Sequence, residues 1–65
     1  MNQLVLASKP LVTITLRSYE IAQASLMVAK SISHCEIEQD ALQSEIDALN
    51  PLIEQAADVL KNMEE

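Results

Sequence analysis

Apolar residues recur at alternating steps of four and three along the second half of the chain. They are Leu42, Ile46, Leu49, Ile53, Ala56, Leu60 and Met63. This spacing places them on one face of an α-helix and is the pattern of a coiled-coil seam. Followed backwards, the same register passes Gln39 and then only apolar or small residues: Cys35, Ile32, Val28, Ser25, Ile21, Ser18, Ile14, Leu11, Ala7 and Leu4. Because the chain has no glycine, the commonest helix terminator, the pattern predicts an all-α protein.

The stretch "SISHCEIE" at residues 31–38 is the best place for the chain to turn. Ser33 and Glu36 have the spacing of a capping box, in which Ser33 accepts from the backbone of Glu36 and the Glu36 side chain reaches back. Glu36 and Glu38 also place negative charge where a helix dipole favours it. We predict a single-domain antiparallel helical hairpin over residues 1–65 with coiled-coil-like packing. The first arm covers about 4–32, the turn about 31–35 and the second arm about 34–64.

The seam predicts which side chains of the two arms face each other. On the first arm these are Leu4, Leu11, Ile14, Ile21, Val28 and Ile32. On the second arm they are Leu42, Ile46, Leu49, Ile53, Ala56 and Leu60. Pro51 falls on the opposite side of the second arm, so its ring does not interrupt the packed face. The unbroken register favours one helix bent at Pro51, although Asn50-Pro51 is also a good helix start and a break there is the alternative.

A continuous helix paired with a copy of itself is the main rival to the hairpin. The column of positions next to the seam distinguishes the two. In the first half it is apolar, with Val5, Val12, Tyr19 and Leu26, and in the second half it is charged, with Asp40, Asp47, Glu54 and Lys61. A uniform two-stranded coil has no need of an apolar column along half its length, so we favour the hairpin. A second alternative is local: residues 11–16, "LVTITL", have the composition of a strand.

The first arm carries a wider apolar stripe than one packing partner requires, and this is the main functional clue. We predict that it binds a partner protein through Val5, Val12, Leu16, Tyr19, Leu26 and Met27. The alternative for any one of these residues is that it covers the edge of the internal core. We also expect the isolated chain to self-associate weakly through such a stripe.

Composition and charge narrow the function. A chain of 65 residues buries a thin core, and its single cysteine, Cys35, excludes an internal disulfide, so a partner chain is the default source of further stability. The net charge is −6, and the chain has no Trp or Phe, which argues against nucleic-acid binding. Residues 1–35 hold three basic residues and one acidic one, whereas residues 36–65 hold nine acidic residues and one basic one. The acidic arm is therefore expected to face solvent.

No chemistry is evident in the residue pattern. His34 is the only histidine and lies at the expected turn without a nucleophile or orienting acid beside it. We expect no catalytic residue, no metal and no cofactor. The uncharged runs are too short to span a bilayer, and the start of the chain lacks the basic region of a signal peptide. A reduced, cytoplasmic location is expected.

The chain resembles the small E-type subunit of the type III secretion needle-chaperone system. The resemblance is carried by the opening "MNQL", the two-arm layout and "LQSEIDAL" at residues 42–49. In that family the subunit is a helical hairpin that pairs with a tetratricopeptide-repeat chaperone as a heterodimer. Together the two hold the needle protein soluble and unpolymerised in the cytoplasm. The resemblance therefore implies a co-chaperone whose partners are that chaperone and, through it, the needle subunit. A self-associating structural coiled coil and a small regulatory or antidote-type binder are the alternatives.

Overall fold

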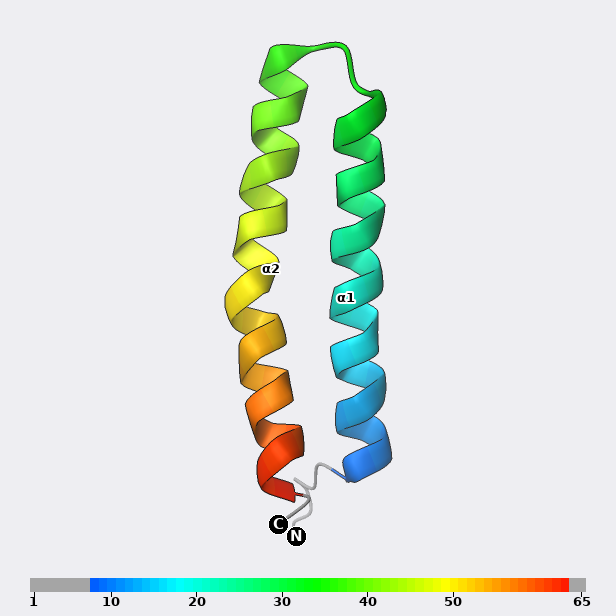
Figure 1. The fold of residues 1–65 in the computed structure, drawn as a ribbon, viewed down its shortest axis with the longest axis vertical. Coiled ribbons are helices and arrows are strands. Elements are labelled where there is room, and N and C mark those ends of the chain that lie inside the picture. Colours follow the sequence, from blue (N-terminus) through cyan, green and yellow to red (C-terminus); the bar gives the residue numbers. More distant parts are fainter. Residues whose placement is uncertain (1–7, 64–65) are drawn as a thin grey trace, which may run out of the picture.

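Two α-helices make up the described part of the chain. The computed structural model describes residues 8–63, in which α1 (Lys9–Ile32) and α2 (Glu36–Met63) are joined by residues 33–35. The helices pack side by side and run antiparallel over their whole length (Figure 1). The predicted hairpin is thus confirmed, and the continuous-helix alternative is wrong because the chain reverses at the turn. The predictions made for Leu4, Val5 and Ala7 lie outside the described residues.

The start of α1 is set by a serine cap. The Ser8 hydroxyl accepts from the N–H of Leu11 at 3.3 Å, and the Ser8 carbonyl accepts from the N–H of Val12 at 2.9 Å. Pro10 lies in the first turn, where its missing N–H leaves no bond unmade. Because Ser8 itself is extended, α1 begins at Lys9. The predicted start of the first arm near residue 4 lies outside the described residues.

The strand-like stretch at residues 11–16 is helical. The hydroxyls of its two threonines donate hydrogen bonds to carbonyls in the preceding turn of the helix. Thr13 donates to the Lys9 carbonyl at 2.8 Å, and Thr15 donates to the Leu11 carbonyl at 2.9 Å. This bonding is the usual way in which threonine is accommodated in a helix interior. The extended alternative is therefore wrong.

Ser33 organises the turn, although not through the predicted partner. Its hydroxyl accepts from the N–H of Cys35 at 3.2 Å and donates to the Glu38 carboxylate at 2.7 Å. The Cys35 carbonyl accepts the first backbone bond of α2, from Gln39 at 2.9 Å. Cys35 therefore occupies the cap position, two residues after Ser33. This shift explains why Glu38, and not Glu36, reaches the serine.

Side chains complete the turn without any residue in the left-handed conformation. Gln39 donates its side-chain N–H to the Ser33 carbonyl at 2.7 Å, and the N–H of Ser33 bonds the Lys30 carbonyl at 3.3 Å. No residue among 8–63 has a positive φ. The absence of glycine from the chain is therefore no obstacle to a tight reversal.

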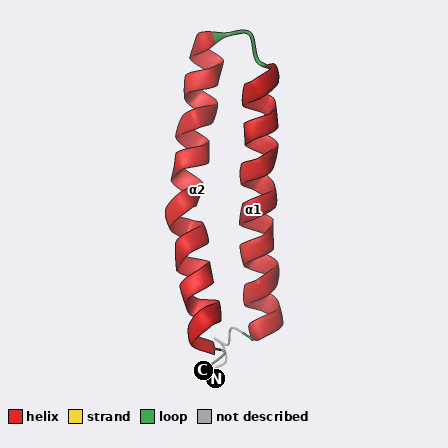
Figure 2. Ribbon diagram, viewed as in Figure 1, coloured by secondary structure: helices red, strands yellow, loops and turns green. Residues whose placement is uncertain are grey.

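Helix α2 continues without interruption through Pro51 (Figure 2), so the alternative of a helix break at Asn50-Pro51 is wrong. Pro51 is exposed, as its predicted place opposite the seam requires. Figure 1 shows that α2 curves gently, with its convex side away from α1. A proline in a helix interior bends the helix in this way because its ring crowds the carbonyl four residues earlier, here that of Asp47.

A polar contact joins the helices beside this proline. The Gln23 side-chain N–H group of α1 donates to the Ile46 carbonyl at 2.9 Å and to the Asn50 side-chain oxygen at 2.8 Å. Both acceptors lie in the turn of α2 that precedes Pro51. Gln23 therefore links α1 to the segment of α2 in which one helical hydrogen bond is missing, because Pro51 has no backbone N–H.

We expect Gln23→Ala to lower the free energy of unfolding by about 1–2 kcal/mol, because it removes both interhelical hydrogen bonds and part of a half-buried side chain. Urea unfolding followed by circular dichroism measures the loss. The matched control is Gln55→Ala, an exposed position of α2, for which we expect a change below about 0.5 kcal/mol. Equal losses at the two positions would show that the Gln23 bonds contribute nothing.

The core between the helices is small. Among the described residues only Val12, Ile46 and Ala56 are buried, with exposed fractions of 8%, 5% and 9%. The predicted inward face of α2 is confirmed, since every member is buried or half-buried: Leu42, Ile46, Leu49, Ile53, Ala56 and Leu60.

The predicted inward face of α1 is wrong for every member that the structure describes. These side chains are 55–69% exposed: Leu11, Ile14, Ile21, Val28 and Ile32. Two other columns face α2 instead, and their members are buried or half-buried: Val12, Leu16, Tyr19, Gln23, Leu26 and Lys30. The physical reason is that three non-helical residues at the turn allow α1 to rotate. In that orientation Gln23 bonds α2 and the Lys30 ammonium donates to the Gln43 side chain.

Candidate protein-binding surface

The residues predicted to bind a partner lie mostly between the two helices. Val12 is buried, and Leu16, Tyr19 and Leu26 are half-buried on the side of α1 that faces α2. Met27 lies outside that contact and is 50% exposed, and Val5 is outside the described residues. The burial of the first four agrees with the alternative that they cover the internal core. Partner binding through them stays a prediction.

A different apolar surface of α1 is open to solvent. Its members follow the three-and-four spacing of a coiled-coil seam. We call this surface the outer face and define it by the exposed residues Leu11, Ile14, Ser18, Ile21, Ser25, Val28 and Ile32. Sequence reasoning identified the same seam but assigned it to the hairpin interior. The outer face therefore retains the geometry needed to pack against a helix, with no helix of this hairpin packed on it.

The flanks of the outer face are small and nearly uncharged. Ala22 lies on one side, Ala24 and Ser31 lie on the other, and all three are exposed. Arg17 is the only charged residue directly beside the seam. Small flanking residues let a second helix approach closely, and the interaxial distance of packed helices depends on such side chains. The outer face is thus suited to helix packing in its shape as well as in its polarity.

Charge is separated between the two helices. Helix α2 carries seven carboxylates, all exposed, against the single Lys61: Glu36, Glu38, Asp40, Glu45, Asp47, Glu54 and Asp58. Helix α1 carries Lys9, Arg17 and Lys30 against the single Glu20. The acidic arm therefore keeps a hydrated outer surface. The exposed apolar seam lies on the other arm.

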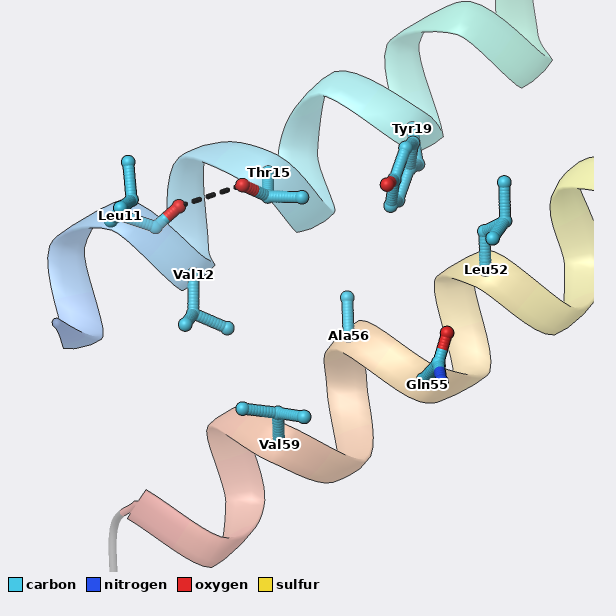
Figure 3. A pocket seen from close by; sticks show the side chains of 8 residues that line it. All are labelled: Leu11, Val12, Thr15, Tyr19, Leu52, Gln55, Ala56 and Val59. Atoms are coloured by element: carbon cyan, nitrogen blue, oxygen red, sulfur yellow. Dashed lines mark hydrogen bonds between the residues drawn. The ribbon is translucent and has the colours of Figure 1, made fainter. Parts of the chain in front are cut away.

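A shallow apolar hollow of about 290 Å³ lies between the helices towards their open ends. Figure 3 shows Tyr19 of α1 projecting towards α2, with Ala56 pointing back at α1 and Leu52 beside it. Leu11 and Val59 are exposed at its edge. The volume is just below the lower limit of typical small-molecule sites. The hollow widens the apolar surface next to the outer face, since Leu11 belongs to both.

Within residues 8–63 no three His, Cys, Asp or Glu side chains are grouped so that they could hold a metal ion. His34 and Cys35 are both exposed at the turn, and the Cys35 thiol is free. Neither α1 nor α2 has an apolar stretch long enough to cross a membrane.

Comparison with known protein families, with curated proteins and with solved structures finds no match to this chain.

Proposed function

We propose that this chain is a small protein-binding subunit that presents the outer face of α1 to a helix of a partner protein. The observation that carries the proposal is the exposed coiled-coil seam on α1. An amphipathic helix docks through apolar residues at this spacing in many complexes. Contiguous exposed apolar surface of this kind typically marks an interaction site.

The small core supports the same function. A hairpin with only three buried side chains in its described part has little hydrophobic stabilisation, and chains of this size commonly depend on association. A partner that covers the outer face would remove Ile14, Ile21 and Val28 from water. Binding would thereby stabilise the folded hairpin by mass action.

The partner class follows from the resemblance to the small co-chaperones of type III secretion. We propose that the partner is a tetratricopeptide-repeat chaperone and that the pair keeps a needle subunit soluble. Helical repeats of that type form concave surfaces against which an exposed helix face can pack. The hairpin form and the acidic second arm support the proposal. In "LQSEIDAL", Leu42, Ile46 and Leu49 hold α2 against α1 and so leave the outer face free.

The test is co-purification from a host that contains the secretion apparatus, using the tagged wild-type chain, Ile21→Asp and Ile37→Asp. Ile21 is 59% exposed in the outer face, whereas Ile37 is 81% exposed on α2 and is not part of that face. The two substitutions are therefore chemically matched, and circular dichroism should show both variants folded. We expect Ile21→Asp to weaken partner binding by about tenfold or more, and Ile37→Asp to leave the affinity nearly unchanged.

The identity of the captured protein decides the class of function. A tetratricopeptide-repeat chaperone together with a needle subunit would support the co-chaperone proposal. A toxin would replace it with the antidote alternative. Equal loss of binding in the two variants would show that the outer face is not the docking surface.

A further inference from the structure

We infer that, in the absence of a partner, a second copy of this chain occupies the outer face, with the two α1 helices antiparallel in a four-helix dimer. The inference uses the surface named in the proposed function but does not depend on the identity of the partner. It rests on the order of large and small residues in the seam, on the placement of charge, and on the length of the face.

The seam contains both large and small side chains. In a pair of identical seams, the large side chains of one copy face the small ones of the other only when the two helices run antiparallel. In a parallel pair, Ser18 and Ser25 would each face their own counterparts, which leaves two underfilled layers with facing hydroxyls. In an antiparallel pair each serine faces a large side chain, and facing large and small residues interdigitate well. The layers are then Ser18 with Ile21, Ser25 with Ile14 and Leu11 with Val28, each formed twice.

Charge placement favours this arrangement. Helix α2 packs on the other side of α1, through the columns of Val12 and Leu16, so contact between outer faces keeps the two acidic α2 helices apart. The only charged residue directly beside the seam, Arg17, lies on the same flank as Ala24 and Ser31, and in the antiparallel pair it faces Ala24 of the second copy. The two Arg17 side chains share one flank but are offset by five residues, about 7.5 Å along the helix axis, where they are exposed to water and their repulsion is screened. Repulsion between the carboxylates of the two copies falls with distance.

The length of the face sets the strength of the dimer. Helix α1 has 24 residues, which corresponds to a length of about 36 Å, and a helix is about 10 Å wide. The contact footprint is then roughly 400 Å² for each copy, well below the ~800 Å² per partner of a standard stable interface. The dimer is therefore weak, with dissociation in the range of about 1–100 μM. A partner that covers more surface can displace the second copy.

Sedimentation equilibrium of the wild-type chain from about 0.5 μM to 1 mM tests for the dimer, over a range that brackets the expected dissociation constant. We expect reversible monomer–dimer exchange for the wild type and for Ile37→Asp. Ile21→Asp should remain monomeric at all concentrations with unchanged helicity. A wild-type chain that is monomeric at the top of this range would overturn the inference. If that monomer still bound its partner, the proposed function would stand without the dimer.

The exposed thiol of Cys35 reports the orientation of the two copies without further mutation. In the antiparallel dimer, nitroxide labels on Cys35 lie at opposite ends of the helix pair. The helical rise per residue puts them more than about 35 Å from each other. In a parallel dimer the two labels would lie at the same end of the helix pair, within roughly 20 Å of each other. Pulsed electron-spin measurements therefore decide the orientation, and a short distance would overturn the antiparallel assignment.

Discussion

Ile46→Ala should lower the free energy of unfolding by about 2–4 kcal/mol, the usual cost of removing a large aliphatic side chain from a core. Ile46 is the least exposed of the three buried residues, at 5%. Its backbone carbonyl also accepts from Gln23, so a cavity there would disturb both the apolar and the polar contacts of α1 with α2. Because the domain is small, this loss is expected to unfold much of the population at 37 °C. Urea unfolding monitored by circular dichroism measures it.

Ile21→Ala is the matched control for Ile46→Ala. The seam pattern alone predicts the same cost at both positions, but Ile21 is 59% exposed in the structure. We therefore expect a loss below about 0.5 kcal/mol at a concentration where the chain is monomeric. A loss as large as that of Ile46→Ala would mean that α1 turns its outer face towards α2 in solution.

Replacing Pro51 by Ala should raise the free energy of unfolding by about 1–3 kcal/mol. Proline costs roughly 3 kcal/mol relative to alanine in a helix interior, because it lacks an N–H and crowds the preceding turn. Alanine would restore the bond to the Asp47 carbonyl. Part of the gain is lost because the helix packing is adapted to the curvature of α2. Thermal and urea unfolding measure the change.

The control for helix propensity is Ser44→Ala, another exposed position in the interior of α2. It should change the stability by about 0.5 kcal/mol or less. If Pro51→Ala instead destabilised the hairpin, the curvature at Pro51 would be required for α2 to follow α1. The straighter helix would then be expected to lose the hydrogen bonds from Gln23 to Ile46 and Asn50.

The inward face of the second helix was predictable because only one of its faces carries a continuous apolar seam. The column next to its seam is charged, with Asp40, Asp47, Glu54 and Lys61, so the seam of Ile46 and Ala56 was the face expected to pack against α1. Pro51 falls outside that face, and the helix continues through it. The position of the turn was also predictable, since Ser33 and the acidic residues after it mark a helix start. The hydrogen bonds of the turn were not predictable. Which side chain caps a helix depends on the exact residue at which the helix begins, and the sequence pattern does not give that residue.

The rotation of the first helix was not predictable from hydrophobic periodicity. Helix α1 has two apolar columns, and the column that continues the register of α2 is the exposed one. A register need not carry across a turn of three non-helical residues. A usable signal lay in the polar residues: Gln23 and Lys30 share the inward side with Val12 and Tyr19, and both find acceptors on α2. Long polar side chains that can reach across a helix pair are compatible with an interface.

The same ambiguity limited the candidate surface. The sequence pattern correctly indicated that α1 has more apolar area than α2 can cover. The pattern did not show which apolar side of α1 would pack against α2, because the two sides are of similar hydrophobicity. Val12 and Leu26 were therefore assigned to a partner, whereas Ile21 and Val28 are the ones left exposed.

The distribution of polar contacts along the hairpin has a consequence for the route of folding. The bond from Lys30 to Gln43 closes a loop of 13 residues, whereas those from Gln23 close loops of 23 and 27. The entropy lost on closure grows with loop length, so contacts nearest the turn form at the lowest cost. Side-chain pairing that begins beside the turn brings the next pair within reach, and the helices then zip towards the open end. Rapid folding dominated by local contacts follows, with the apolar open end closing last and opening first.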